Sequence, residues 1–431
     1  MIRPVLLTAL MAALAVSACS DDEDPRLPGE RIPIRASADP TLPTPEARPL
    51  PPVAAQADWT HRGGGAQRSG GRLEAPASLS LAWRVSAGAG ADERIPMAGP
   101  VIADGAVFVR DGESGVEAFT TSGAAKWSVD LTPEGEDGEE GYGGGVGYAD
   151  GKLYVTDGFG QLTALDAATG NELWRVQGTA PYRAAPTARG GMVVAVNRAD
   201  VATGYDAATG EKKWEIETGL PNAGNLGGAS PGLATDVAVL PFGSGELMLV
   251  RTGPGFRVWT ATLVSLGRTS GLSAFSDITS DPVLAPGPRV IAGNAGGALA
   301  LFDGRNGRRV WQRDFGSLTP VWAAGDTLYA VTTQPAVVRL DMETGRTLWR
   351  APLEAREDPD DATTAIVYGG PVLAGDRVLI TSSDGRLMSF DAQTGAPGQV
   401  VEMPGGSRTG PAVAGGTVYV LTDEGDLLAY R

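Results

Sequence analysis

A motif that returns about every 45 residues constrains this chain more than any other feature of its sequence. Three copies are nearly identical, and each places a tryptophan four residues after its glycine: Asp166-Ala-Ala-Thr-Gly170, Asp206-Ala-Ala-Thr-Gly210 and Asp341-Met-Glu-Thr-Gly345. Three looser copies keep the same spacing to a tryptophan: Gly123, Gly255 and Gly307. A motif at a fixed period of this length indicates a fold built from repeated units.

Each copy predicts four short strands. In the copy that covers residues 147–176, Asp150-Gly151 and Asp157-Gly158 mark turns, because glycine adopts positive φ without a Cβ penalty. The β-branched and aromatic run Leu153–Thr156 lies between these turns, and Glu172–Val176 alternates in the manner of a strand. Glycines and turns recur too often for a helical repeat of similar length. Four short strands per repeat, arranged around a ring, predict an all-β propeller.

Proline and glycine openings predict the number of blades. Eight such openings precede short apolar runs: Pro100, Gly144, Pro186, Pro231, Pro282, Pro320, Pro371 and Pro411. The last unit ends at Arg431 without an outer strand, and Leu79–Val85 is an unpaired strand at the other end of the domain. We therefore expect an eight-bladed β-propeller of four-stranded blades, closed by pairing of the N-terminal and C-terminal strands. The seventh copy departs from the pattern, with Gln399 in the place of the tryptophan.

The N-terminus predicts a lipid anchor. Residues 1–18 combine Arg3 with an apolar run too short to span a membrane, as is typical of a signal peptide. Val16-Ser17-Ala18-Cys19 resembles the bacterial lipobox, so Cys19, the one cysteine of the chain, is the predicted lipidation site. The alternative is an ordinary signal peptide with a small-residue cleavage site. In enteric-type bacteria, Asp after the lipidated cysteine retains a lipoprotein in the inner membrane. Ser20 at this position favours the periplasmic face of the outer membrane.

Composition separates a tether from the propeller. Residues 19–57 are rich in proline and lack apolar periodicity, which predicts a disordered, lipid-anchored tether. The propeller is expected at residues 58–431, and Trp59 starts a segment that is expected to cover one end of the ring.

A formal net charge of −16 argues against nucleic acid as a partner. The acidic runs at residues 134–140 and 354–361 are interpreted as solvated loops, with calcium binding or contact with a basic partner as alternatives.

The repeats resemble the tryptophan-docking repeats of pyrroloquinoline-quinone dehydrogenases. This resemblance implies an adjacent cysteine pair above the quinone and a calcium ion held by Glu and Asn beside a catalytic Asp. One cysteine cannot form such a pair, and His61, the one histidine, cannot by itself build a metal site or a catalytic triad. We expect His61 in a surface or capping loop. The sequence therefore predicts no catalytic residue, no cofactor and no metal.

The lipobox, the proline-rich tether and a propeller of quinone-type repeats without quinone ligands together resemble the BamB family. These are lipoproteins of the β-barrel assembly machinery in the outer membrane. The resemblance implies a non-catalytic scaffold that docks a periplasmic POTRA domain of the central barrel protein BamA. It would thereby support folding and insertion of outer-membrane proteins. The alternative is a periplasmic ligand-binding or sensing propeller related to the quinoprotein dehydrogenases.

The resemblance also implies partner-binding residues in two loops. Asp277 matches the first acidic position of the family's Ser-Asp-x-Asp loop, and Thr279 stands in place of the second acid. In the other loop Ala223-Gly224-Asn225-Leu226 takes the place of the family's Leu-x-Leu-Arg, so the arginine and one leucine are absent. The predicted partner-binding residues are Asn225, Leu226, Asp277 and Thr279.

Overall fold

The computed structural model describes residues 48–91, 98–219, 228–264, 276–358 and 364–431. The chain divides into two compact units, residues 1–40 and 41–431, and every described residue lies in the second unit. Cys19 and the signal peptide lie outside the described residues. The described residues are almost all strands and turns, with a single turn of 3-10 helix, η1 (Gly138–Gly141). No helix in these ranges has the length and apolar character needed to cross a membrane.

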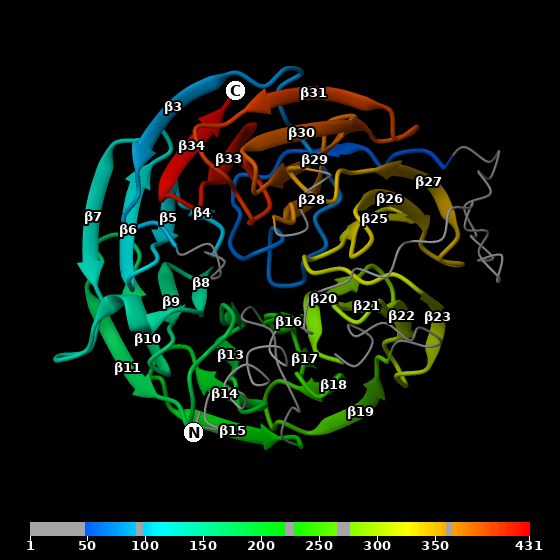
Figure 1. Cartoon of the computed structure of the whole chain (residues 1–431). Coiled ribbons are helices and arrows are strands. Elements are labelled where there is room, and N and C mark those ends of the chain that lie inside the picture. Colours follow the sequence, from blue (N-terminus) through cyan, green and yellow to red (C-terminus); the bar gives the residue numbers. More distant parts are fainter. Residues whose placement is uncertain (1–47, 92–97, 220–227, 265–275, 359–363) are drawn as a thin grey trace, which may run out of the picture. The chain divides into compact units, whose positions relative to one another are not determined.

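The strands of the described residues form eight mainly antiparallel sheets whose inner strands stand in a closed circle (Figure 1). The innermost strands are β4 (Val101–Ala103), β8 (Gly145–Ala149), β12 (Thr187–Arg189), β16 (Gly232–Leu233), β20 (Ile278–Ala285), β24 (Trp322–Ala324), β28 (Tyr368–Ala374) and β32 (Ala412–Ala414). Each one contacts the next in this order, and β32 contacts β4. Because β4, β24 and β32 pack between neighbouring sheets, all of their residues are buried.

Three further strands continue each sheet outward. The second strands are β5 (Ala106–Arg110), β9 (Lys152–Thr156), β13 (Met192–Val196), β17 (Val237–Pro241), β21 (Arg289–Asn294), β25 (Thr327–Thr332), β29 (Arg377–Ser382) and β33 (Thr417–Leu421). The third strands are β6 (Gly115–Thr120), β10 (Gln161–Asp166), β14 (Val201–Asp206), β18 (Glu246–Arg251), β22 (Leu299–Asp303), β26 (Ala336–Asp341), β30 (Arg386–Asp391) and β34 (Asp426–Tyr430). The outer strands are β7 (Ala125–Asp130), β11 (Glu172–Gln177), β15 (Lys212–Glu217), β19 (Arg257–Thr262), β23 (Arg309–Arg313), β27 (Thr347–Pro352), β31 (Pro397–Glu402) and β3 (Leu81–Ser86). Residues of the outer strands alternate between exposed and more buried positions, as in β31, because only one face of each outer strand packs on a neighbour.

The prediction of eight four-stranded blades is wrong, because the structure has seven blades of four strands. The remaining sheet, which contains β28–β31, has six strands. Its two additional strands are β1 (Val53–Ala54) and β2 (Arg72–Leu73), which pair in parallel with each other, and Leu73 of β2 pairs with Ala374 of β28. Val53 and Ala54 fall in the segment that composition assigned to the tether. A two-residue strand in a proline-rich segment has no periodicity that could reveal it.

Closure by the two ends of the domain is confirmed. Strand β3 pairs antiparallel with β34, from Leu81 opposite Tyr430 to Ser86 opposite Asp426. The sheet order is β3-β34-β33-β32, so the N-terminal strand supplies the outer strand that the last repeat lacks.

The tryptophan of each motif joins its own sheet to the next one. The indole of Trp311 in β23 lies against Gly345, where an added Cβ would stand 2.6 Å from Cδ2 of the ring. Its Nε1 donates to the carbonyl oxygen of Met342 in the same turn at 3.0 Å. The tryptophan–turn contact, defined as an indole against the turn glycine of the next sheet, occurs seven times: Trp83–Gly123, Trp127–Gly170, Trp174–Gly210, Trp214–Gly255, Trp259–Gly307, Trp311–Gly345 and Trp349–Gly395. The motif therefore encodes the interface between two blades as well as a turn within one blade.

Gln399 makes the corresponding link at the place where the ring closes. Its side-chain Nε2 donates to the carbonyl oxygen of Leu79 at 2.9 Å, and its Oε1 accepts from the amide of Leu79, also at 2.9 Å. Leu79 lies just before β3, so the amide side chain of β31 binds the backbone that leads into the closing strand. An amide can donate and accept at once, which an indole cannot do. Gln399 in place of the tryptophan therefore suits a different neighbour, the backbone of Leu79.

Residues 53–73, which we call the strap, lie inside the circle of sheets (Figure 1). Trp59 is buried and stacks on Trp322 of β24 with ring centroids 5.7 Å apart. Trp59 also exchanges two backbone hydrogen bonds with Ile102 of β4. The segment that begins at Trp59 therefore covers one end of the ring, as expected, and it is continuous with β1 and β2.

Gly345→Ala is expected to destabilise the protein more than Gly375→Ala. Both glycines have positive φ, +66° and +59°, so both alanines carry a similar backbone penalty. Apart from its chain neighbours, no described atom lies within 4 Å of a Cβ at Gly375, whereas a Cβ at Gly345 would overlap Trp311. We expect Gly345→Ala to lower the unfolding free energy by about 2 kcal/mol more, measured by chemical denaturation. Equal losses would show that the tryptophan–turn contact contributes nothing.

Candidate docking surface

The two ends of the ring differ in the chain segments that they carry. The connections between successive sheets, and the turns that join second to third strands, lie at one end, which we call the connection face. The turns from first to second and from third to fourth strands lie at the opposite end, the turn face. The strap bonds to the turn-face ends of the inner strands, and Arg48, which precedes it, pairs with Asp341 at 2.8 Å. The connection face is therefore the candidate docking surface.

Two of the four predicted partner-binding residues lie on buried parts of this face. Asn225 and Leu226 lie outside the described residues. Asp277 is buried, and its carboxylate accepts from Nη1 of Arg183 at 3.0 Å. Thr279 is also buried, and its hydroxyl donates to the carbonyl oxygen of Ser317 at 3.0 Å. Asp277 and Thr279 thus make contacts within the protein, and a role of any of the four in partner binding stays a prediction.

Arg183 is the residue that the sequence reasoning missed. Its guanidinium also lies 3.8 Å from Asp200, whose two oxygens accept from the amides of Gly243 at 2.8 Å and Ser244 at 2.9 Å. These groups come from three consecutive sheets, so the cluster ties the connections before β12 and β20 to the turn between β17 and β18. Removing one partner from a buried ion pair leaves an uncompensated charge, which is why such a cluster is rigid. No local pattern in the sequence pairs Arg183 with an aspartate 94 residues away.

Exposed apolar side chains lie on the connection face near this cluster. Leu318, between β23 and β24, is 47% exposed, and Val264, just after β19, is 39% exposed. The side chain of Gln312 in β23 donates to the carbonyl oxygen of Val264 at 3.0 Å, which ties the segment after β19 to the outer strand of the next sheet. Exposed apolar side chains on supported loops are typical of a protein-binding surface.

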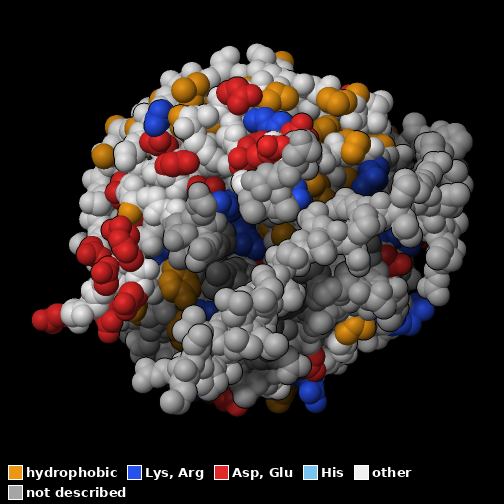
Figure 2. Space-filling view, viewed as in Figure 1, with side chains coloured by type: hydrophobic (Ala, Val, Ile, Leu, Met, Phe, Trp, Pro, Cys, Tyr) orange, Lys and Arg blue, Asp and Glu red, His pale blue; other side chains and the backbone are white. Residues whose placement is uncertain are grey.

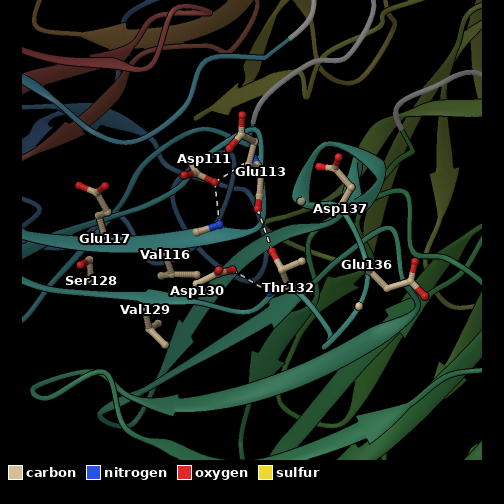
Figure 3. Close-up of a pocket in the computed structure, with 13 residues that line it drawn as sticks. Asp111, Glu113, Val116, Glu117, Ser128, Val129, Asp130, Thr132, Glu136 and Asp137 are labelled. Atoms are coloured by element: carbon tan, nitrogen blue, oxygen red, sulfur yellow. Dashed lines mark hydrogen bonds between the residues drawn. The ribbon is translucent and has the colours of Figure 1, made fainter.

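A second feature of the connection face is an acidic groove of about 660 Å³ (Figure 3). Six acidic residues line it: Asp111, Glu113, Glu117, Asp130, Glu136 and Asp137. Acidic side chains also gather on this side of the molecule in Figure 2. Oδ1 of Asp111 accepts from the amides of Glu113 at 2.9 Å and Gly115 at 2.7 Å, so this carboxylate holds a turn. The hydroxyl and the amide of Thr132 lower the pKa of Asp130.

The groove does not resemble a metal site. In the part of the chain that the structure describes, no three His, Cys, Asp or Glu side chains are grouped so that they could hold a metal ion. Asp111 and Asp130 accept hydrogen bonds within turns, and Glu117 and Glu136 lie apart from each other (Figure 3).

His61 is buried in the strap rather than exposed at the surface. Its Nε2 accepts from the amide of Ala188 at 3.1 Å, and its Nδ1 lies 3.0 Å from the hydroxyl of Thr60. Burial, followed by the positive charges of Arg68 and Arg189, lowers the pKa of His61 from 6.5 to about 3. A neutral, buried imidazole that accepts a backbone hydrogen bond acts as a structural group here.

The sequence model and the relatives that match this chain point to one protein family. The sequence model described as outer membrane protein assembly factor BamB matches residues 113–351 and 336–431. The protein of that name from Salmonella typhimurium is 28% identical over 361 residues, covering 80% of this chain and 87% of the relative. The Escherichia coli K12 protein is 26% identical over 353 residues, with the same coverage of 80% and 87%.

Solved structures support the fold. BamB from Moraxella catarrhalis superposes with a TM-score of 0.68 at 21% identity, covering 82% of this chain and 100% of that one. A europium-containing methanol dehydrogenase superposes nearly as well, with a TM-score of 0.67 at 16% identity, covering 84% of this chain and 89% of that one. The fold alone therefore does not separate an assembly factor from a dehydrogenase.

Acid is expected to destabilise the native chain through His61. The pKa of the folded state lies near 3 and that of an unfolded histidine near 6.5, so between these values the unfolded state binds a proton that the folded state excludes. The stabilisation is complete above pH 6.5 and is lost as the pH falls, by on the order of 1 kcal/mol per pH unit.

His61→Gln is the matched variant for this prediction, because a glutamine oxygen can still accept from the Ala188 amide and does not titrate. Denaturation curves at pH 7, 6, 5 and 4 should show a smaller loss of stability for His61→Gln than for the native protein. The same loss in both proteins would contradict the assignment.

Proposed function

Because the chain belongs to the BamB family of outer membrane protein assembly factors, we propose that it is a non-catalytic scaffold in the assembly of outer-membrane proteins. The observation that carries this proposal is the family match, which continues through the repeats to the last residue of the ring. In this role the protein binds and orients a partner. A closed ring of tightly linked sheets is suited to this because it presents its surface without rearrangement.

The motif residues and the strap residues that the structure describes are engaged in structural contacts, as a scaffold requires. The tryptophans face the turns of neighbouring sheets, and the aspartates of the motif accept hydrogen bonds within their own turns, as Asp341 does from Thr344. The strap fills the turn-face end of the ring, and Arg62 and Arg68 of the strap are engaged with Asp281. No observation favours the alternative of a ligand-sensing propeller over the scaffold.

We propose that the partner is a POTRA domain of a BamA-like barrel protein and that it docks on the connection face. The strap and Arg48 are bonded to the turn face, so we assign the partner to the connection face. Val264 and Leu318 supply apolar area, and Asn225 and Leu226 belong to the neighbouring connection before β16. Asp277 contributes indirectly, because its ion pair with Arg183 holds these connections in place.

We also propose that lipidation at Cys19 anchors the protein to the periplasmic face of the outer membrane. Several acyl chains on one residue give stable membrane attachment. The segment between Cys19 and Arg48 would act as the tether.

Val264→Glu combined with Leu318→Glu is expected to weaken binding of a purified POTRA fragment at least about tenfold, because it places two charges in the apolar part of the surface. Isothermal titration calorimetry with the mature chain measures this affinity. Leu226→Glu should weaken binding in the same direction.

Phe256→Glu is the control for these variants. Phe256 is 71% exposed, more than either docking residue, but it lies on the turn face between β18 and β19. It should leave the affinity unchanged. If Phe256→Glu weakens binding and the connection-face variants do not, the docking face has been assigned to the wrong end.

Cys19→Ala is expected to abolish lipid modification and to release the protein from the outer-membrane fraction. The substitution removes the thiol that would be acylated, whereas Ser20→Ala beside it keeps the thiol and should remain membrane-bound. Membrane fractionation with immunodetection compares the two variants. Retention of Cys19→Ala in the outer membrane would refute the anchor.

A further inference from the structure

The strap makes one complete circuit of the ring. It bonds to the eight sheets in their order around the circle, beginning with the sheet that contains the chain's C-terminal strand. In this order the amides that donate to it are Gly415 to Gln56 O (2.7 Å), Ile102 to Trp59 O (2.9 Å), Tyr148 to Thr60 O (2.9 Å), Ala188 to His61 Nε2 (3.1 Å), Leu233 to Ala66 O (2.8 Å), Leu284 to Gln67 O (3.0 Å) and Gly375 to Leu73 O (2.7 Å). The sheet of β24 binds through Trp322, whose Nε1 donates to the carbonyl oxygen of Gly71 at 2.6 Å.

The circuit closes on itself at β1 and β2. Val53 pairs with Arg72 and Ala54 pairs with Leu73, so the start and the end of the strap lie side by side in one parallel ladder. The same ladder continues into β28 through Leu73. The strap is therefore a closed loop inside the closed ring, held at every sheet.

Side chains of the strap reinforce the backbone bonds on one side of the circuit. Arg68, only 1% exposed, donates to Asp281 at 2.9 Å, to the hydroxyl of Thr187 at 3.0 Å and to the carbonyl oxygen of Pro231 at 2.6 Å. One guanidinium thus joins three neighbouring sheets. Arg62 donates to the same Asp281 through Nε at 3.0 Å, so the buried carboxylate is paired twice.

At the next sheet, two residues after Arg68, the strap is held by shape. Gly70 passes so close to Trp322 that an added Cβ would stand 2.2 Å from two ring atoms. The indole of Trp322 is in turn stacked on Trp59, with planes 6° apart. Only a glycine at position 70 permits this stack together with the hydrogen bond from Trp322 to Gly71.

We propose that the strap is a second closure of the ring, which keeps the eight sheets together when the pairing of β3 with β34 is broken. Two neighbouring sheets can separate only if the strap also breaks or is stripped from the sheets on one side of the gap. The two closures act in parallel because the strap bonds the sheet of β32 through Gln56 and the sheet of β4 through Trp59. Those are the two sheets that β3 joins, because β3 pairs with β34 in the sheet of β32 and is followed along the chain by β4.

A two-by-two set of variants of the mature chain tests this proposal. Arg84→Pro with Val85→Pro breaks the first closure, because neighbouring residues alternate in their ladder bonds and one of the two prolines must remove a donor from β3. Gly70→Ala loosens the strap at Trp322. Each lesion alone should leave a folded ring, since the other closure remains.

The variant with both prolines and Gly70→Ala is expected to lose far more stability than the sum of the losses in the two separate variants. If the two lesions acted independently, their losses of stability would add. If the two closures act in parallel, each one limits the loss of stability while the other is broken. We expect the combined fall in Tm, measured by differential scanning calorimetry, to exceed the sum of the separate falls by at least about 4 °C. A combined fall equal to that sum would overturn the proposal.

Gly65→Ala is the matched control in the same strap. Its backbone needs no positive φ, and no atom beyond its neighbours lies within 4 Å of an added Cβ among the described residues. Combined with the two prolines, it should add nothing to their effect. If the chain with Gly70→Ala and both prolines does not fold while the Gly65→Ala combination does, the proposal is supported in its strongest form.

Hydrogen exchange gives a second measurement, made on the variant that carries only the two prolines. The seven amides that donate to the strap should stay protected in the Arg84→Pro, Val85→Pro variant while the amides of β3 and β34 lose protection. Loss of protection at all seven amides in that variant would mean that the strap depends on the first closure, and would overturn the proposal.

Discussion

The contact between the tryptophan of one sheet and the turn of the next is the interaction on which the ring depends. The indole covers a turn glycine, where any side chain would collide with it, and its single donor satisfies a carbonyl oxygen of the same turn. Turn residues in the Asp-x-x-Thr-Gly order fold back on themselves because Asp341, for example, accepts from both the amide and the hydroxyl of Thr344. The turn is therefore a rigid surface before the tryptophan reaches it. A repeat of one local motif thus specifies a repeated interface, and the interfaces accumulate into a ring.

The place where the ring closes has different requirements. Gln399 replaces the tryptophan there and forms two hydrogen bonds with Leu79, since the next sheet begins with a strand from the other end of the domain. The strap passes the same place and bonds the sheets on both sides of it. A ring made from one linear chain must join its two ends once, here through the pairing of β3 with β34, and this protein has additional contacts around that joint. The strap precedes β3 along the chain, so a pull on the proposed anchor at Cys19 would meet the strap before it reaches β3.

The buried charges form two clusters, one around Asp281 at the strap and one around Arg183 on the connection face. Burial alone would raise the pKa of Asp281, but Arg62 and Arg68 outweigh burial and hold the pKa below its usual value. On the connection face Arg183 joins Asp277 and Asp200 across three sheets. Both clusters consist of ion pairs between segments far apart in sequence; the first holds the strap, and the second holds loops of the connection face. The Asp277 position is thus important for the candidate surface through its support of the loops, whereas the exposed area comes from other residues.

The sequence by itself determined the repeat, the all-β character, the strand that closes the ring and the absence of a cysteine pair, because each depends on local pattern or on counting. Turn glycines, strand alternation and tryptophan spacing act within about 45 residues, so they can be read without knowing the fold. Only the tertiary structure decided that residues 53–73 form a strap, that one sheet has six strands, and that His61 and Asp277 are buried. The strap is held by backbone hydrogen bonds to sheets up to 359 residues away, and such bonds carry no side-chain signature. Whether a charged side chain faces solvent or an opposite charge depends on which distant segment folds against it, and this is settled only when the ring closes.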